Sequence, residues 1–297
     1  MHWILFNKLL YSLSFFSLDS FKWIQRSKKW FTILFLFVIY LPWIVIIFLS
    51  FVKPGDKGEV STNLWNFGKN WSFDNYFTFF SFGAKNDFFW GSLWNSFSIA
   101  ISALCPSLWI ALLTAFSLWK RGGRYKSIVF KLSNLSISSP ELIQGLSFML
   151  LFIAIFLPLG YNFGYPTIVL SHIAFLVPYG IILIYPRLEK LNKKLLFAGK
   201  DLNCGELETL FKIVLPQIKG TIAFCCLVLI ILSMDDFIIT NLVKGRVTTL
   251  TTQLYTMKKG VKAWSMCFGS ISLLLAFTVF IGYSFFKKEG KRQWEVI

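Results

Sequence analysis

The hydrophobic residues of this chain gather into six long stretches, separated by shorter segments rich in polar and charged residues. A helix needs about 20 mostly apolar residues to cross the hydrocarbon core of a bilayer, and each stretch meets this requirement. The stretches lie at about 30–52, 90–119, 127–157, 166–185, 221–243 and 264–286. The polar run SNLSISSPE interrupts the third one. The pattern therefore predicts an all-α polytopic membrane protein with six transmembrane helices.

The segments outside the predicted spans complete the organisation of the chain. Residues 1–29 are apolar but have no basic start and no small-residue cleavage site. We therefore expect a helix on the inner membrane surface here, and not a signal peptide. An inner connection, 186–220, precedes the fifth span, and a short tail, 287–297, follows the sixth. The outer connection 53–89 is rich in Trp and Phe, and we expect it to cover the membrane surface or to contact a partner.

Composition and charge agree with this class of protein. The chain is 56% hydrophobic and 15% charged, which is too apolar for a soluble domain of this length. Its formal net charge is +16, and most Lys and Arg fall in the N-terminal segment, the second and fourth connections and the tail. Lys and Arg favour the cytoplasmic side, so both termini are predicted to be cytoplasmic. A smaller basic group at 244–262 runs against this rule. The positive charge is assigned to anionic lipid of the cell membrane, and not to nucleic acid.

The sequence lacks the motifs of a nucleotide-dependent or metal-dependent enzyme. It has no GxxxxGK[ST] loop to hold ATP phosphates, and its two histidines exclude a multi-histidine metal site. None of the five cysteines forms a C-x-x-C pair. We therefore expect no catalytic residue, no metal and no cofactor bound by this chain.

The inner connection 186–220 is expected to form a helix–turn–helix. Its apolar residues recur at helical spacing, at Leu191, Leu195, Ala198 and Leu202. The run NCG at 203–205 then breaks the helix, because Asn203 and Gly205 both tolerate the left-handed conformation of a tight turn, and we expect Gly205 to adopt it. Glu206 and Glu208 begin a second helix, which Pro216 should end just before the fifth span. The residues alone leave two interpretations open: a hairpin that packs on lipid head groups, or a docking element for a cytoplasmic partner.

The run LLFAGKDLNCGELETLFKIVLP at 195–216 resembles the cytoplasmic loop of ABC importer permeases. That family has the pattern E-A-A, a Gly four residues later, and then I-x-L-P. In this sequence Phe197 stands in place of the Glu, Gly199 in place of the second Ala, and Asn203 in place of the Gly. The resemblance assigns an ATPase-coupling loop to Ala198, Gly199, Asp201, Asn203, Gly205, Ile213, Leu215 and Pro216.

Three further runs, SPELIQGLSFMLLF, SHIAFLVPYGIILIYPRL and LSMDD, resemble the C-type permease subunit of spermidine/putrescine importers. This resemblance implies a type I ABC importer permease fold that forms half of a translocation path for polyamines. It also implies a homologous second permease, an ATPase dimer that binds ATP-Mg, and an extracellular polyamine-binding protein or lipoprotein. Membrane lipid is a further expected partner, and nucleic acid is not.

Three carboxylates, Glu141, Asp235 and Asp236, lie inside predicted spans. An acid costs roughly 3 kcal/mol at the centre of a membrane helix and usually faces a polar path or a cation. Measured along continuous helices, Glu141 and Asp235 each lie about 21 Å from the inner end of their span, so the acids could share one level. Pro140, just before Glu141, can kink the third span because it removes a helix hydrogen bond. We expect them to line the substrate path. The structural alternative is that Lys131, Ser or Asn side chains satisfy them. His172 is expected to form a hydrogen bond within the bundle.

Other functions remain possible at this point. The first is an ABC importer permease for another small solute. The second is an ion-coupled secondary transporter, although the chain has no visible inverted repeat. A membrane-embedded enzyme is not supported, because no nucleophile and base are arranged together.

Overall fold

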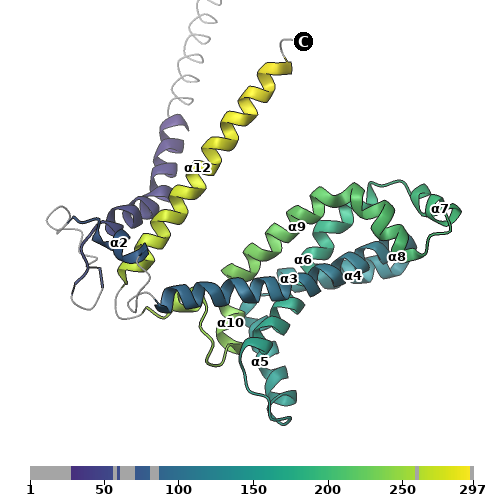
Figure 1. Ribbon diagram of the computed structural model, residues 1–297, viewed down its shortest axis with the longest axis horizontal. Helices are drawn as coiled ribbons and strands as arrows, with labels where there is room; N and C mark the ends of the chain where they lie inside the picture. The colour runs from purple at the N-terminus through teal and green to yellow at the C-terminus, as the bar shows by residue number, and fades with distance from the viewer. Residues whose placement is uncertain (1–27, 56–58, 61–70, 81–86, 258–260, 295–297) are drawn as a thin grey trace, which may run out of the picture. The chain divides into compact units, whose positions relative to one another are not determined.

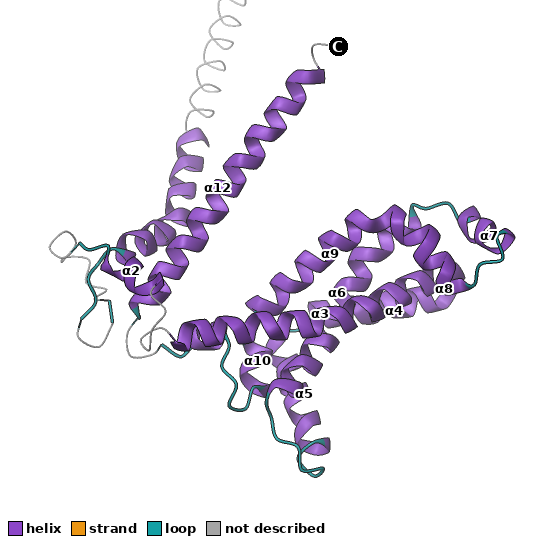
Figure 2. Cartoon of the chain, in the orientation of Figure 1, coloured by secondary structure: helices purple, strands orange, loops and turns teal. Residues whose placement is uncertain are grey.

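The computed structural model describes residues 28–55, 59–60, 71–80, 87–257 and 261–294. Within these ranges the secondary structure is helical, apart from two isolated β-bridges (Figure 2). The chain divides into two compact units, one of residues 1–81 with 259–297 and the other of residues 82–258. All of the predicted interfacial segment 1–29 except its last two residues lies outside the described residues.

The first unit contains a long helix at each end of its sequence. A helix at Lys28–Ser50 and α12 at Ala263–Trp294 accompany the short helix α2 at Asp74–Phe80. The hydroxyl of Tyr76 in α2 lies 2.6 Å from the Ser50 hydroxyl and donates to the Ser270 hydroxyl at 3.0 Å. This tyrosine therefore ties the end of the first helix to α12. The helix α12 continues to Trp294, well past the predicted end of the sixth span.

The second unit holds the predicted path residues and the inner connection. Its elements are α3 (Asp87–Arg121), α4 (Gly123–Ser138), α5 (Glu141–Ile155), α6 (Tyr165–Glu189), α7 (Lys194–Asp201), α8 (Glu206–Glu208), the π-helix η2 (Thr209–Val214), α9 (Leu215–Asp235), α10 (Ile238–Val243) and α11 (Leu250–Tyr255). The helices α3 and α6 pack along each other, and α9 packs against both (Figure 1).

The packing of α3 on α6 depends on small residues at their crossing. A Cβ atom at Gly180 would lie only 2.6 Å from the Cβ of Ala111, so the two backbones approach too closely for a larger side chain. Small residues at a helix crossing allow this kind of close approach in membrane proteins. Large buried side chains on either side of the crossing, among them Trp119, Leu176 and Leu229, fill the core.

Five described helices are long and apolar enough to cross a membrane, and the pair α4 and α5 makes a sixth if it counts as one broken span. These two helices meet at an angle of 103°. The kink expected at Pro140 is therefore present, and the depth estimated for Glu141 along a continuous helix was wrong. Residues before a proline avoid the helical conformation, and Ser139, which precedes Pro140, is extended at φ −76° and ψ 141°. Gln144 bridges the bend, because its amide donates to the Ser136 carbonyl at 2.6 Å.

The fifth span begins earlier and ends earlier than the pattern indicates. The elements α8, η2 and α9 form one membrane-length helix over Glu206–Asp235. The prediction that Pro216 ends a short helix was wrong. Pro216 lies in the first turn of α9, directly after the π-helical turn of η2. A proline cannot supply the next helical N–H, and a π-turn changes the hydrogen-bond register where that bond would be needed. The helix stops instead at the two aspartates.

Candidate substrate path and coupling loop

The break between α9 and α10 is built around the carboxylate of Asp236. Asp235 is the last residue of α9, Asp236 is extended, and α10 begins two residues later. The carboxylate of Asp236 accepts hydrogen bonds from the backbone N–H of Ile239 at 3.3 Å and of Thr240 at 2.8 Å. The Thr240 hydroxyl donates to the same carboxylate at 2.7 Å. Asp236 therefore satisfies the free N–H groups at the start of α10, and it is only 7% exposed.

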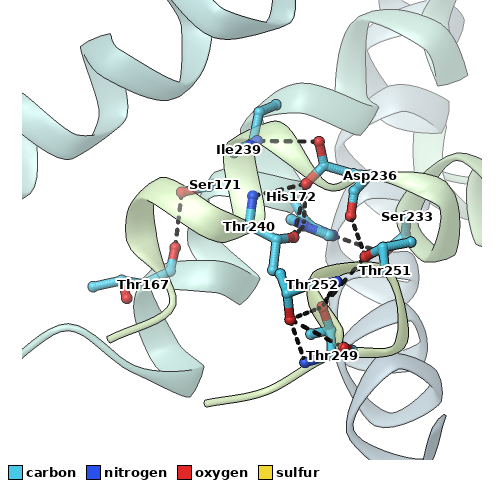
Figure 3. Close-up of polar contacts among 10 residues, drawn as sticks. All are labelled: Thr167, Ser171, His172, Ser233, Asp236, Ile239, Thr240, Thr249, Thr251 and Thr252. Carbon is cyan, nitrogen blue, oxygen red and sulfur yellow. Dashed lines mark hydrogen bonds and ion pairs between the residues drawn. The ribbon is translucent and has the colours of Figure 1, made fainter. Parts of the chain in front are cut away.

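The side chain of His172, in α6, contacts residues on both sides of this break (Figure 3). Its Nδ1 lies 2.7 Å from the hydroxyl of Ser233 in the last turns of α9, and its Nε2 lies 2.9 Å from the hydroxyl of Thr240 in α10. The same Nε2 is 3.4 Å from an oxygen of Asp236. The ring is only 1% exposed. His172 thus contacts both helices at the break, which is more than the single bond within the bundle that the sequence suggested.

Threonines fix the far side of the break. The Thr251 hydroxyl donates to the backbone carbonyl of Asp236 at 2.9 Å, and the Thr167 hydroxyl donates to the carbonyl of Val243 at the end of α10, at 2.7 Å. Thr249 caps α11 by accepting from the backbone N–H of Thr252. The polar groups exposed by the broken helix are therefore satisfied by side chains from α6, α10 and α11.

Asp235 and Glu141 differ from Asp236, because both are exposed. Glu141 is the first residue of α5, and it is close enough to both aspartates for its charge to interact with theirs. Below it, α5 packs tightly on α10: a Cβ atom at Gly145 would lie 3.3 Å from the Cα of Ile239. Within the described residues neither Glu141 nor Asp235 forms an ion pair, with Lys131 or any other residue. Among the three acids, only Asp236 has buried partners.

The coupling loop contains a left-handed turn at a different residue from the one expected. Asn203 has φ 55°, the one positive φ of a non-glycine residue in the described ranges. Gly205 is extended at φ −66° and ψ 170°, so the prediction that it supplies the left-handed turn was wrong. The turn is closed by the N–H of Cys204, which donates to the carbonyl of Gly199 at 2.9 Å.

Gly199 is the buried residue of α7, and Thr209 of η2 packs directly on it. A Cβ atom at Gly199 would lie 2.5 Å from the Thr209 hydroxyl oxygen. The Thr209 hydroxyl also donates to the carbonyl of Gly205 at 2.9 Å, within the second arm of the loop. The contact between Gly199 and Thr209 holds the two arms of the loop together, and comparing Gly199 with the family motif could not reveal it.

The remaining loop residues divide into an exposed set and a half-buried set. The exposed residues are Phe197, Ala198, Asp201, Leu202, Asn203, Gly205 and Pro216, and the half-buried ones are Ile213 and Leu215. Phe197 is 62% exposed, although it is a large apolar side chain. Lys120, at the end of α3, forms an ion pair with Glu206 at the start of α8. The loop therefore presents an apolar face while its base is fixed to the transmembrane helices.

Replacing Gly199 with alanine should destabilise the coupling loop, and a second substitution should restore it. The new Cβ atom would overlap the hydroxyl and methyl groups of Thr209, and overpacking of this kind typically costs about 1–3 kcal/mol. In Gly199→Ala we expect a lower midpoint of thermal unfolding for the assembled transporter, and a lower uptake rate. Thr209→Ala removes both overlapping groups, so the double variant should recover most of the loss.

Gly205→Ala is the matched control for this experiment. No atom lies within 4 Å of a Cβ atom placed at Gly205, and its backbone is extended, so this variant should match the unmodified protein. A double variant as unstable as Gly199→Ala would show that the contact with Thr209 does not hold the loop.

The described residues hold no group of three His, Cys, Asp or Glu side chains that could bind a metal ion. Membrane-length helices, a broken helix that presents carboxylates, and a helix–turn–helix loop at the far end of α9 together define the membrane-embedded permease component of a transport system. A family model described as "Binding-protein-dependent transport system inner membrane component" matches residues 89–288, and the chain belongs to this family. The resemblance seen in the sequence is thereby confirmed, as is a multi-pass transport subunit of the membrane.

Curated relatives cover most of the chain. A protein of Mycoplasma genitalium named "Spermidine/putrescine transport system permease protein PotC homolog" is 35% identical over 84% of this chain and 87% of its own length. The protein of Mycoplasma pneumoniae with the same name is 36% identical over 86% of this chain and 87% of its own. The PotC permease of Escherichia coli K12 is 29% identical over 82% of this chain and 87% of its own.

A solved structure shares the fold. It is a bacterial ABC transporter involved in the import of the acidic polysaccharide alginate, with a TM-score of 0.62 and 16% identity, over 88% of this chain and 94% of that one. The predicted all-α fold of an ABC importer permease is therefore confirmed. The cytoplasmic position of both termini stays a prediction.

Proposed function

We propose that this chain is a permease subunit of an ATP-driven ABC importer and forms half of the translocation path for polyamines such as spermidine and putrescine. The observation that carries the proposal is a pair of exposed carboxylates at two helix breaks: Asp235 at the end of α9 and Glu141 at the start of α5. A polyamine carries several ammonium groups, and carboxylates can replace the water that each group loses. The names of the relatives from Mycoplasma and Escherichia coli agree with a cargo of this charge.

The proposed partners follow from the description of the family and from the lack of an ATP-binding motif in this chain. Its family is described as binding-protein-dependent, which supports an extracellular polyamine-binding protein or lipoprotein. The sequence has no loop for ATP phosphates, so ATP-Mg would bind to a separate ATPase dimer, and this chain would hold no cofactor. A homologous second permease would supply the other half of the path.

The helix Glu206–Asp235 suggests how the ATPase acts on the path. Its 30 residues correspond to about 45 Å of helix, and it joins the coupling turn to the aspartates without a loop between them. The exposed face of α7, with Phe197, Ala198 and Leu202, would contact the ATPase. Phe197 would make an apolar contact where the family has a charged Glu. A displacement of α7 would reach Asp235 through α9, because Thr209 and Gly199 pack α7 against the same helix.

The test is uptake of radiolabelled spermidine and putrescine by the complete transporter in proteoliposomes. We expect uptake that requires ATP inside the vesicles and the binding protein outside, and that continues when an ionophore removes ion gradients. Uptake driven by an ion gradient without ATP would support a secondary transporter instead. ATP-dependent uptake of another solute, with none of either polyamine, would assign a different cargo.

A further inference from the structure

A chain of four buried side chains lies behind the exposed acids. It runs from Ser233 through His172 and Thr240 to Asp236, and each of these residues is at most 7% exposed (Figure 3). None of them is placed to touch a cargo. His172 comes from α6, while the other three come from the two sides of the α9–α10 break.

The hydrogen bonds of the ring use both of its nitrogens. The Thr240 hydroxyl donates its proton to Asp236, so its oxygen accepts a hydrogen bond from His172 Nε2. On the other edge of the ring, Nδ1 is hydrogen-bonded to the Ser233 hydroxyl at 2.7 Å. Each of the four side chains therefore has a hydrogen-bond partner. The ring therefore bridges the last turns of α9 and the first turn of α10 through its two nitrogens, on opposite edges.

We propose that His172 is a positioning residue for transport: it sets the geometry of the α9–α10 break and so holds the exposed Asp235 toward the cargo. This inference rests on the proposed function, because it assigns His172 an effect on the same path. Asp235 is the last helical residue between the two points that His172 holds, Ser233 and Thr240. A side chain with a single hydrogen-bonding group could bond to Ser233 or to Thr240, but not to both.

The experiment compares variants of His172 in the complete transporter. His172→Leu removes both bridges, and His172→Gln keeps a donor near the place of Nε2. Ser171→Ala is the matched control, because Ser171 is also buried in α6 but bonds only within its own helix, to the Thr167 carbonyl at 2.8 Å. We expect His172→Leu to raise the KM for spermidine uptake roughly tenfold, as the loss of one good contact to a cation would. Basal ATP hydrolysis should be unchanged, His172→Gln should recover part of the loss, and Ser171→Ala should behave as the unmodified protein.

Two further measurements separate positioning from a general structural role. In an Asp235→Asn background, His172→Leu should cause no further rise in KM, since it acts through that carboxylate. Hydrogen exchange of the assembled transporter should be faster in His172→Leu for peptides that cover 233–243, at the end of α9 and in α10, and should be unchanged for peptides of α6. An additive rise in KM in the double variant, or unchanged exchange over 233–243, would overturn the proposal.

The exchange measurement needs no cargo, so it decides the inference even if the unmodified transporter takes up no polyamine and the proposed function fails. If His172→Leu does not assemble, Ser233→Ala removes one bridge alone. The proposal then requires a smaller rise in KM, again absent in the Asp235→Asn background.

Discussion

Asp235→Asn should strongly reduce polyamine uptake by a transporter that still assembles and still hydrolyses ATP. The substitution keeps the size of the side chain and removes its charge. Asp235 is exposed and has no ion pair within the described residues, so the substitution breaks no ion pair among them. A hydrogen bond to a charged group contributes about 1.5–3 kcal/mol, and losing one contact would weaken cargo binding roughly 10- to 150-fold.

Uptake of radiolabelled spermidine across a range of concentrations measures this effect. Asp74→Asn is a suitable control, because Asp74 is an exposed acid at the start of α2, in the other unit. Glu141→Gln should have a smaller effect than Asp235→Asn if the bend at Pro140 leaves Glu141 at the rim of the path. Normal uptake by the combined Asp235→Asn and Glu141→Gln variant would remove these carboxylates from the path.

The length of the apolar stretches was enough to predict the class of fold. Five helices of membrane length and one broken pair overlap the six stretches of the hydrophobic pattern, although the fifth helix is shifted toward the N-terminus. Pro140 also marked the bend correctly, since a proline restricts the residue before it. The size of the bend could not be predicted, because it depends on the hydrogen bond from the Gln144 amide to the carbonyl of Ser136 and on how α5 packs against α10 at Gly145.

The break in the fifth span was missed because it contains neither glycine nor proline. The run SMDDF holds none of the residues that most often end a helix, and its two acids indicate a functional site as readily as a helix start. In the structure the carboxylate of Asp236 takes the place of helical carbonyls by accepting from Ile239 and Thr240. This signal was present in the sequence, since Asp is a preferred residue just before a helix.

The position of the left-handed turn in the coupling loop was decided by a distant contact. Both Asn203 and Gly205 can adopt a positive φ, so propensity could not choose between them. The packing of Thr209 on Gly199, and its hydrogen bond to the carbonyl of Gly205, fix the second arm of the loop. Asn203 is therefore the residue that takes the left-handed conformation, and this choice depends on a contact that the sequence does not reveal.

Asp236→Asn should destabilise the transporter and not only slow it, although the chemical change is the same as in Asp235→Asn one residue earlier. Asp236 is buried and accepts three hydrogen bonds, from two backbone N–H groups and one hydroxyl. An amide has one acceptor oxygen, so its NH2 group would face a donor. Each buried polar group left without a partner costs about 1–3 kcal/mol, and the bridge from His172 would be disturbed as well.

The two neighbouring variants therefore form a matched pair, measured by the yield of assembled transporter, its midpoint of thermal unfolding, and uptake per assembled complex. We expect a lower yield and midpoint for Asp236→Asn, and unchanged values for Asp235→Asn with reduced uptake per complex. The reason for the difference is the helix break: adjacent residues point in different directions, so one acid faces the buried side chains of α6 while its neighbour stays exposed. If Asp236→Asn were as stable as the unmodified transporter and yet inactive, the charge of Asp236 would act on the cargo directly. The structural role assigned to it would then be wrong.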